Sequence, residues 1–102
     1  MSEADVIAAI EAEWELNTGF VGKARSGEFD HSGLERALEK LRDLRFDEGV
    51  EIPRRLVSLL WYMPLALSWQ VERVRAGGGD VAAYTRAVTE ITNEVERILG
   101  VP

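Results

Sequence analysis

The longest run of hydrophobic positions lies in the middle of the chain and predicts a central helix. From Leu56 to Leu67 only Ser58 and Pro64 interrupt the apolar residues. On a helical wheel these side chains point in every direction, and a helix that is apolar all round is covered either by other protein or by lipid. We therefore predict a helix over 52–76 around which the rest of the chain packs.

A proline lies inside this predicted helix without shifting its hydrophobic phase. Pro64 removes the backbone hydrogen bond to the Leu60 carbonyl and clashes with it, at a cost of about 3 kcal/mol in a helix interior. The apolar stripe nevertheless keeps its spacing on both sides, at Leu56, Leu60, Met63, Leu67, Val71 and Val74. We expect one continuous helix, kinked at Pro64 and with Pro53 in its first turn, where the missing N–H has no helical partner.

The first predicted helix starts after Ser2, a capping residue, and ends at Gly27, which suits a left-handed cap. Its stripe recurs every three or four residues, at Ile7, Ile10, Trp14, Asn17, Val21 and Ala24. Gly19 and Gly22 weaken a helix, so we expect either a bend or the close approach of a neighbouring backbone at these positions.

Two further helices are predicted in the same way, each from a capping residue and a stripe of apolar residues. Ser32 is the predicted cap of the second, whose apolar face consists of Leu34, Ala37, Leu38, Leu41 and Leu44. Asp80 is the predicted cap of the last, whose stripe consists of Val81, Tyr84, Val88, Ile91, Val95 and Ile98 and which ends at Gly100. On the polar side of the second helix, Arg36 and Lys40 are a like-charged pair four residues apart, which costs a few tenths of a kcal/mol.

Short connections join these helices, at Gly27, at 47–49 and at the three glycines 77–79. No segment has a sustained alternation of period two, which a half-buried strand would show. We therefore predict the all-α class and a single domain over 1–102. The expected architecture is a four-helix up-down bundle whose third helix is central, apolar and kinked.

Composition narrows the classes of function. Apolar residues make up 46% of the chain and charged residues 29%, which is typical of a globular protein. There is no cysteine, which excludes disulfides and thiolate chemistry, and Glu3 and Asp5 stand where a signal peptide has basic residues. Both observations fit a cytoplasmic protein. The net charge of −6 argues against direct binding of nucleic acid, which requires clustered Lys and Arg.

The charge is unevenly distributed along the chain. Residues 1–30 are acidic and residues 52–76 are basic. We interpret these charges as the solvated faces of ordinary helices. An attraction between the two segments within the fold is the alternative. Arg54 and Arg55 face the positive end of the helix dipole, which is unfavourable for cations. Pairing with Glu48 or Glu51 is the simplest account of the two arginines, and binding of an acidic partner is the alternative.

None of the patterns typical of catalysis or metal binding is complete. The apolar run is shorter than the ~20 residues that span a bilayer, so we expect no membrane span. The only histidine, His31, lies in a predicted loop without a second histidine, so we expect no metal. Glu11 and Glu15 share a helix face while Glu13 points elsewhere, and all three are interpreted as surface charge. We predict no catalytic residue and no cofactor.

By exclusion, we interpret the protein as a non-enzymatic helical module that binds itself or another protein through the third helix. One alternative is a small acidic inhibitor or immunity-type protein that occupies a basic site on a nucleic-acid enzyme. A second alternative is a sensor for a small apolar ligand, with a pocket beside the Pro64 kink. The residues predicted for the interaction are Leu59, Trp61, Tyr62, Leu65, Arg54 and Arg55, and those predicted for the pocket are Trp14, Met63 and Trp69.

The interaction hypothesis rests on the two flanks of the third helix. A four-helix bundle buries one broad face of each helix, which leaves one flank with Leu59, Tyr62 and Ala66 and another with Val57, Trp61 and Leu65. Such an exposed apolar patch is typical of an interaction site. We expect a homodimer or a constitutive complex with Trp61, Tyr62 and Leu65 near its centre.

Overall fold

The computed structural model describes residues 2–102, which contain six α-helices, one short 3₁₀ helix and no strand. The prediction of the all-α class is confirmed, and the prediction of four helices is replaced by six. Their bounds are α1 Glu3–Glu11, η1 Ala12–Trp14, α2 Phe20–Ala24, α3 His31–Arg42, α4 Arg54–Ser68, α5 Val71–Ala76 and α6 Val81–Leu99.

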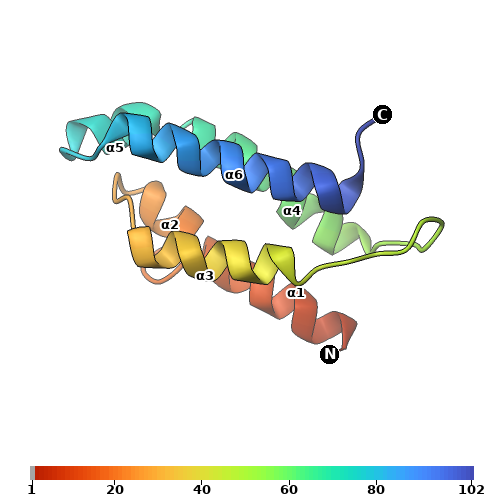
Figure 1. Ribbon diagram of the computed structural model, residues 1–102. Coiled ribbons are helices and arrows are strands. Elements are labelled where there is room, and N and C mark those ends of the chain that lie inside the picture. The colour runs from red at the N-terminus through yellow and green to blue at the C-terminus, as the bar shows by residue number, and fades with distance from the viewer. Residues whose placement is uncertain (1) are drawn as a thin grey trace.

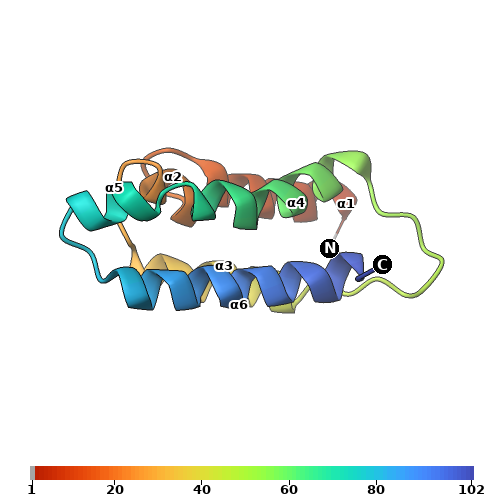
Figure 2. The same cartoon turned by 90° about the horizontal axis from the view of Figure 1, so that it is seen from above.

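The helices lie in four columns around a shared core. In Figure 1, α4, α5 and α6 form the upper layer and α1, α2 and α3 the lower one. Seen from above in Figure 2, α1, α2, α4 and α5 lie along one side while α3 and α6 lie along the other. The column of α4 and α5 therefore lies beside α6 and beside the column of α1 and α2, and it is diagonal to α3.

One hydrophobic core takes residues from all six α-helices. Burial of these side chains is the main driving force for the fold. From α4, the buried residues Leu56, Leu60, Met63 and Leu67 are the inner stripe predicted from the sequence. From α6, Tyr84 is fully buried and its hydroxyl donates a hydrogen bond of 2.6 Å to the Leu67 carbonyl near the end of α4.

The prediction of one continuous helix between Ser2 and Gly27 is wrong. The chain leaves helical geometry after Trp14 and resumes it at Phe20, and Asn17 of the predicted stripe is exposed. Close approach of the backbone explains the glycines, because a Cβ on Gly22 would lie 1.8 Å from the Glu15 carbonyl oxygen. Thus the bend and the close backbone approach, which were expected as alternatives, occur together.

The third predicted helix is also divided. Pro64 lies inside α4 with helical residues on both sides, as expected, while the kink itself stays a prediction. The helix ends at Ser68, and α5 begins at Val71 after a turn. The buried Gln70 in this turn donates a side-chain hydrogen bond of 3.2 Å to the Ala66 carbonyl, which satisfies one acceptor at the helix end.

Side-chain caps fix several helix ends. Ser2 caps α1 as predicted and forms a capping box with Asp5, and Asp80 accepts the Ala83 N–H at 3.0 Å. The prediction of Ser32 as a cap is wrong, because Asp30 accepts the Gly33 N–H at 3.0 Å and α3 already begins at His31. The carboxylate of Asp30 reaches this N–H from outside the first turn, the usual position of a cap.

Candidate functional site

The outer face of α4 has a run of exposed aromatic side chains. Trp61, Tyr62 and Trp69 are 56%, 46% and 62% exposed, and they are half of the six large hydrophobic residues exposed among 2–102. No charged residue lies between Ser58 and Trp69 in the sequence. We call the outward-facing residues of this segment the aromatic stripe: Ser58, Trp61, Tyr62, Leu65, Ser68 and Trp69. It extends along the helix for about 16 Å at 1.5 Å per residue.

Two aromatic rings of the stripe pack against each other. The Trp61 and Tyr62 ring centroids are 4.8 Å apart at an interplanar angle of 87°, an edge-to-face arrangement. This geometry is favourable for aromatic pairs because the positive ring edge meets the negative ring face. The two side chains are therefore held in position on the surface.

Only part of the predicted apolar surface is exposed. Leu59 and Ala66 are 6% and 7% exposed, so their prediction as surface residues is wrong. Leu59 lines a small hollow with Trp14 and Glu15, which shows that the segment after α1 covers this flank. On the opposite flank, Val57 and Leu65 are half-buried and Trp61 is exposed.

An open hollow of about 360 Å³ lies beside Pro64, between α4 and α6. Its lining has no charged residue and consists of Trp61, Pro64, Leu65, Ser68, Val88 and Thr92. The pocket residues predicted from the sequence are not brought together here. Met63 is 1% exposed within the core, and Trp14 lines the separate hollow on the opposite flank.

The hydroxyl groups in this hollow bond to their own helices. Ser68 Oγ donates to the Leu65 carbonyl at 2.7 Å, and Thr92 Oγ1 donates to the Val88 carbonyl at 2.7 Å. Ser and Thr side chains commonly bond to a preceding carbonyl in this way. Neither hydroxyl needs a further acceptor, so the surface of the hollow behaves as an apolar one.

The two arginines at the start of α4 have different surroundings. Arg55 bonds to Glu11 Oε2 through Nη2 at 2.8 Å and through Nε at 3.2 Å, so its predicted pairing with Glu48 or Glu51 is wrong. This pair joins the acidic first helix to the basic central one. Arg54 is exposed and lines a small hollow with Glu51 and Pro53.

The carboxylate of Glu13 is buried in a cluster of polar groups that was not predicted from the sequence. Glu13 is 1% exposed, and its interpretation as surface charge is wrong. Its Oε1 accepts the Phe20 N–H at 3.0 Å and Arg36 Nη2 at 2.9 Å, while Oε2 accepts Arg36 Nε at 2.9 Å and Lys40 Nζ at 2.5 Å. The cluster joins η1, the start of α2 and α3.

The cluster shifts the acidity of Glu13 through opposing effects. Burial raises the pKa of Glu13, while hydrogen bonds from Arg36, Lys40 and the Phe20 N–H lower it, and the net result is a pKa below the ordinary 4.5. The carboxylate is thus ionised at neutral pH. Asp30 also has a lowered pKa, chiefly because Lys23 bonds to it at 2.9 Å.

His31 is exposed and packs its ring on Phe29 at a centroid distance of 4.0 Å. Among residues 2–102, no three His, Asp or Glu side chains are placed to hold a metal ion.

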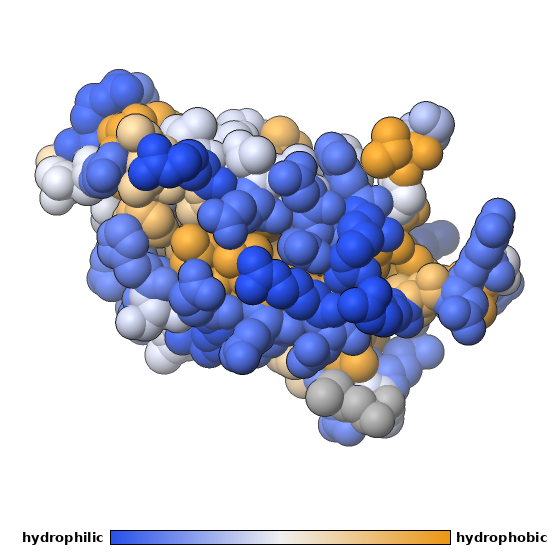
Figure 3. All heavy atoms as spheres, viewed as in Figure 1, coloured by the Kyte–Doolittle hydropathy of each residue, from blue (hydrophilic) through white to orange (hydrophobic). Residues whose placement is uncertain are grey.

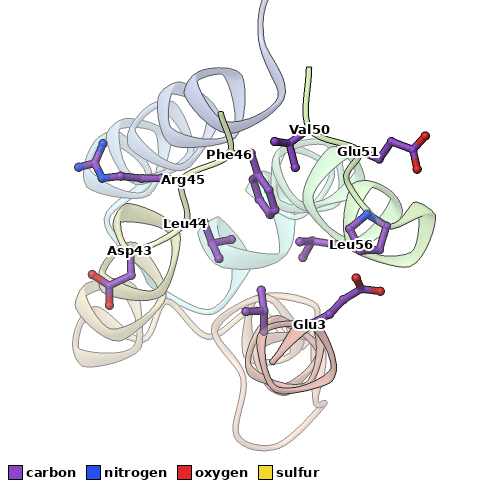
Figure 4. Close-up of a pocket in the computed structure, with 10 residues that line it drawn as sticks. Glu3, Asp43, Leu44, Arg45, Phe46, Val50, Glu51 and Leu56 are labelled. Carbon is purple, nitrogen blue, oxygen red and sulfur yellow. The ribbon is translucent and has the colours of Figure 1, made fainter. Parts of the chain in front are cut away.

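A second open hollow of about 380 Å³ lies at the end of the molecule where α1 and α4 begin and α3 ends. In Figure 4, Leu44, Phe46, Val50 and Leu56 point into it, while the charged ends of Asp43 and Arg45 point away. Its interior is therefore apolar, and seven of its ten lining residues lie in the connection between α3 and α4.

The surface of α3 and α6 differs from the aromatic stripe. Viewed from this side, hydrophilic residues cover most of the molecule (Figure 3). Here Arg97 bonds to Glu94 at 2.9 Å and to the Leu41 and Leu44 carbonyls at 2.9 and 3.0 Å. This face therefore carries charges of both signs.

Comparisons of the chain with models of known families, with curated proteins and with solved structures found no match. Within residues 2–102, no helix combines the length and apolar character that crossing a membrane requires.

Proposed function

We propose that this chain is a non-enzymatic, cytoplasmic interaction module that binds another protein chain through the aromatic stripe on α4 and the adjoining face of α6. The observation that supports this most directly is the exposure of Trp61, Tyr62 and Trp69 on an uncharged segment. Tryptophan and tyrosine dominate the energetics of protein interfaces. A contiguous exposed apolar surface is also a mark of interaction sites.

The stripe lies on a rigid element, which favours binding. The opposite side of α4 contributes Leu60, Met63 and Leu67 to the core, each at most 1% exposed. A surface that is already ordered loses less conformational entropy when a partner binds. We also infer that the six helices are a broken up-and-down four-helix bundle, and that a bend at Pro64 shapes the hollow in the stripe.

The arrangement of Glu13 supports a non-enzymatic role. Its two carboxylate oxygens accept four hydrogen bonds, from Phe20, Arg36 and Lys40, and it lines none of the hollows described above. A carboxylate that acts in proton transfer has access to a substrate in a cleft. Glu13 instead stabilises the junction between η1, α2 and α3.

The alternatives receive less support. An inhibitor of a nucleic-acid enzyme would present an acidic face, whereas Arg42 and Arg97 lie 3.9 Å and 2.9 Å from Glu94 on α6. A sensor would enclose its ligand, whereas the hollow beside Pro64 is open to solvent.

A photo-cross-linking amino acid at position 68 tests the interaction in cells, because Ser68 is exposed in the stripe and lines the hollow but is not one of its aromatic anchors. We expect covalent adducts with another protein chain when the cross-linker replaces Ser68. The matched control places it at Asn93, an exposed position on α6 that does not line the hollow. Absence of any adduct at position 68, or equal adducts at both positions, would contradict the proposed function.

A further inference from the structure

The segment that carries the aromatic stripe is basic in an acidic chain. Residues 52–76 contain four arginines and one glutamate, which gives this segment a charge of +3. Because the whole chain has a charge of −6, the other residues together have −9. No charged residue lies between Ser58 and Trp69, so the four arginines lie before and after the stripe in the sequence. The stripe is therefore an uncharged surface with basic residues on either side of it.

One arginine extends the stripe at the start of α4. Arg54 lies four residues before Ser58 and seven before Trp61, a spacing that places all three on one face of the helix. Arg54 is exposed, and although Glu51 lines the same small hollow, Arg54 forms no ion pair within residues 2–102. No carboxylate of this part of the chain neutralises its positive charge.

Two further arginines lie beyond the other end of the stripe. Arg73 on α5 donates a hydrogen bond of 2.9 Å to the Arg25 carbonyl, at the end of α2. Both side chains are exposed, and neither forms an ion pair in the described part of the chain. A backbone carbonyl is a neutral acceptor, so it leaves the charge of Arg73 uncompensated. The stripe thus has uncompensated positive charge near both ends.

This distribution of charge defines the chemistry of the partner. Charged groups across an interface are arranged so that positive regions of one partner meet negative regions of the other. A partner that matches this surface presents an apolar centre to Trp61 and Tyr62 and carboxylates to the arginines at the two ends. An uncharged partner would leave the arginines unmatched, and a basic one would be repelled.

A protein fits this surface better than an anionic membrane does. Carboxylates lie on the flank of α4 that faces α1, because the Glu11 side chain is 42% exposed beside Arg55 and Glu15 lines a hollow with Leu59. A flat anionic bilayer that covered the stripe would also come close to these carboxylates, and like charges repel. A protein surface can place its acidic groups opposite the arginines alone.

We propose that the partner is an acidic protein, whose apolar surface covers the aromatic stripe while its carboxylates pair with Arg54 at one end and with Arg25 and Arg73 at the other. This inference rests on the proposed function and specifies the chemistry of its partner. Charged groups at the rim of an interface mainly raise the rate of association, and salt screens them. The complex therefore weakens as salt is raised.

Charge reversals combined with the cross-linker at position 68 test this partner. Arg54→Glu and Arg25→Glu should each lower the yield of protein adducts at least about threefold, because an attractive contact becomes a repulsive one. In a cell extract, the adducts of the wild-type arginines should also decrease as sodium chloride is raised from about 0.05 M to about 0.3 M. Mass spectrometry should identify the adducted protein as acidic.

Two matched variants serve as controls. Arg45→Glu makes the same change of charge at an exposed arginine in the connection after α3, the column diagonal to α4. Arg54→Lys keeps the positive charge at the start of the stripe. Both should leave the yield of adducts within about 1.5-fold of the wild type, well inside the threefold change above. Circular dichroism of the purified variants checks that each remains helical.

The outcomes separate this inference from the proposed function. Adducts that are insensitive to the reversals, that respond equally to Arg45→Glu, that increase with salt or that contain a basic protein overturn the acidic partner and leave the proposed function standing. The purified chain should not sediment with vesicles of phosphatidylcholine and phosphatidylglycerol. Sedimentation with them that Arg54→Glu abolishes would overturn this partner in favour of a lipid surface. Absence of any adduct at position 68 overturns both the inference and the proposed function.

Discussion

At the scale of single residues, Glu13 is the side chain whose surroundings the sequence predicts least well. Its position beside two other glutamates suggests solvent exposure, yet it is 1% exposed and bonded to Arg36 and Lys40. One signal was present in the sequence, because two cations four residues apart on one helix face repel each other. An anion placed between them removes that repulsion. The sequence does not show which of the chain's carboxylates takes this place.

Glu13→Gln should destabilise the fold by about 2–4 kcal/mol. The amide keeps the shape of the side chain but leaves Arg36 and Lys40 without their anion, and breaking a buried ion pair by removing one partner is strongly destabilising. Urea denaturation followed by circular dichroism measures the change. Glu15→Gln, at an exposed position on the same segment, is the control and should change stability by less than about 0.5 kcal/mol. Equal effects of the two substitutions would show that the Glu13 cluster contributes little.

At the scale of elements, helix starts and stops are predictable where the signal is local. Ser2 and Asp80 cap their helices as expected, and Gly27 and Gly100 have positive φ angles of 85° and 89°. The breaks within helices are not predictable in this way, because they depend on distant partners. The chain between η1 and α2 turns where Glu13 reaches the Phe20 N–H. At the end of α4, the Leu67 carbonyl accepts a hydrogen bond from the hydroxyl of Tyr84 on α6.

Gly22→Ala should destabilise the fold by about 3 kcal/mol or more. The added Cβ would lie 1.8 Å from the Glu15 oxygen and 2.4 Å from its carbonyl carbon, so the backbone itself has to move. Gly49→Ala is the informative comparison, because Gly49 has a positive φ of 85° but open space around it. Its expected cost is the conformational strain alone, about 1–2 kcal/mol. Thermal denaturation by circular dichroism ranks the two variants, and the reverse order would refute the close approach.

Pro64→Ala should leave the stability of the isolated chain unchanged or raise it, by no more than about 2 kcal/mol. Alanine restores the N–H that can bond to the Leu60 carbonyl and has a far higher helix propensity. The greater flexibility of the unfolded chain offsets about 0.4–1 kcal/mol of this gain. Differential scanning calorimetry at low protein concentration measures the effect. A large fall in melting temperature would mean that the bend is required for packing in the monomer.

At the scale of the whole molecule, the periodicity of the sequence determines which residues form the core, while the packing of the helices determines which of the remaining apolar residues are exposed. The inner stripe of α4 follows from spacing alone, since Leu56, Leu60, Met63 and Leu67 are all buried as predicted. The flanks do not, because their exposure depends on where neighbouring columns lie. The irregular segment after α1 covers Leu59, while nothing among the described residues covers Trp61 to the same degree.

Acid should destabilise the molecule chiefly through its bonded carboxylates. Glu13 and Asp30 have pKa values below their ordinary 4.5 and 3.8, so the unfolded chain binds protons more readily than the folded one. Their contribution to stability is therefore complete above about pH 5 and is lost as the pH falls through the lowered folded values. Urea denaturation between pH 7 and pH 3 should show this decline, and the decline should be smaller for Glu13→Gln. Parallel curves for the two proteins would contradict it.

The uneven exposure of the three tryptophans decides what their fluorescence can report. Trp61 and Trp69 already emit from largely aqueous surroundings in the folded chain, and only Trp14 is half-buried. Unfolding therefore changes the environment of one indole out of three, and emission is a poor gauge of folding in this molecule. A protein that covers α4 excludes water and dissolved quenchers from Trp61. Acrylamide quenching thus becomes an optical assay for occupancy of the stripe that requires no label.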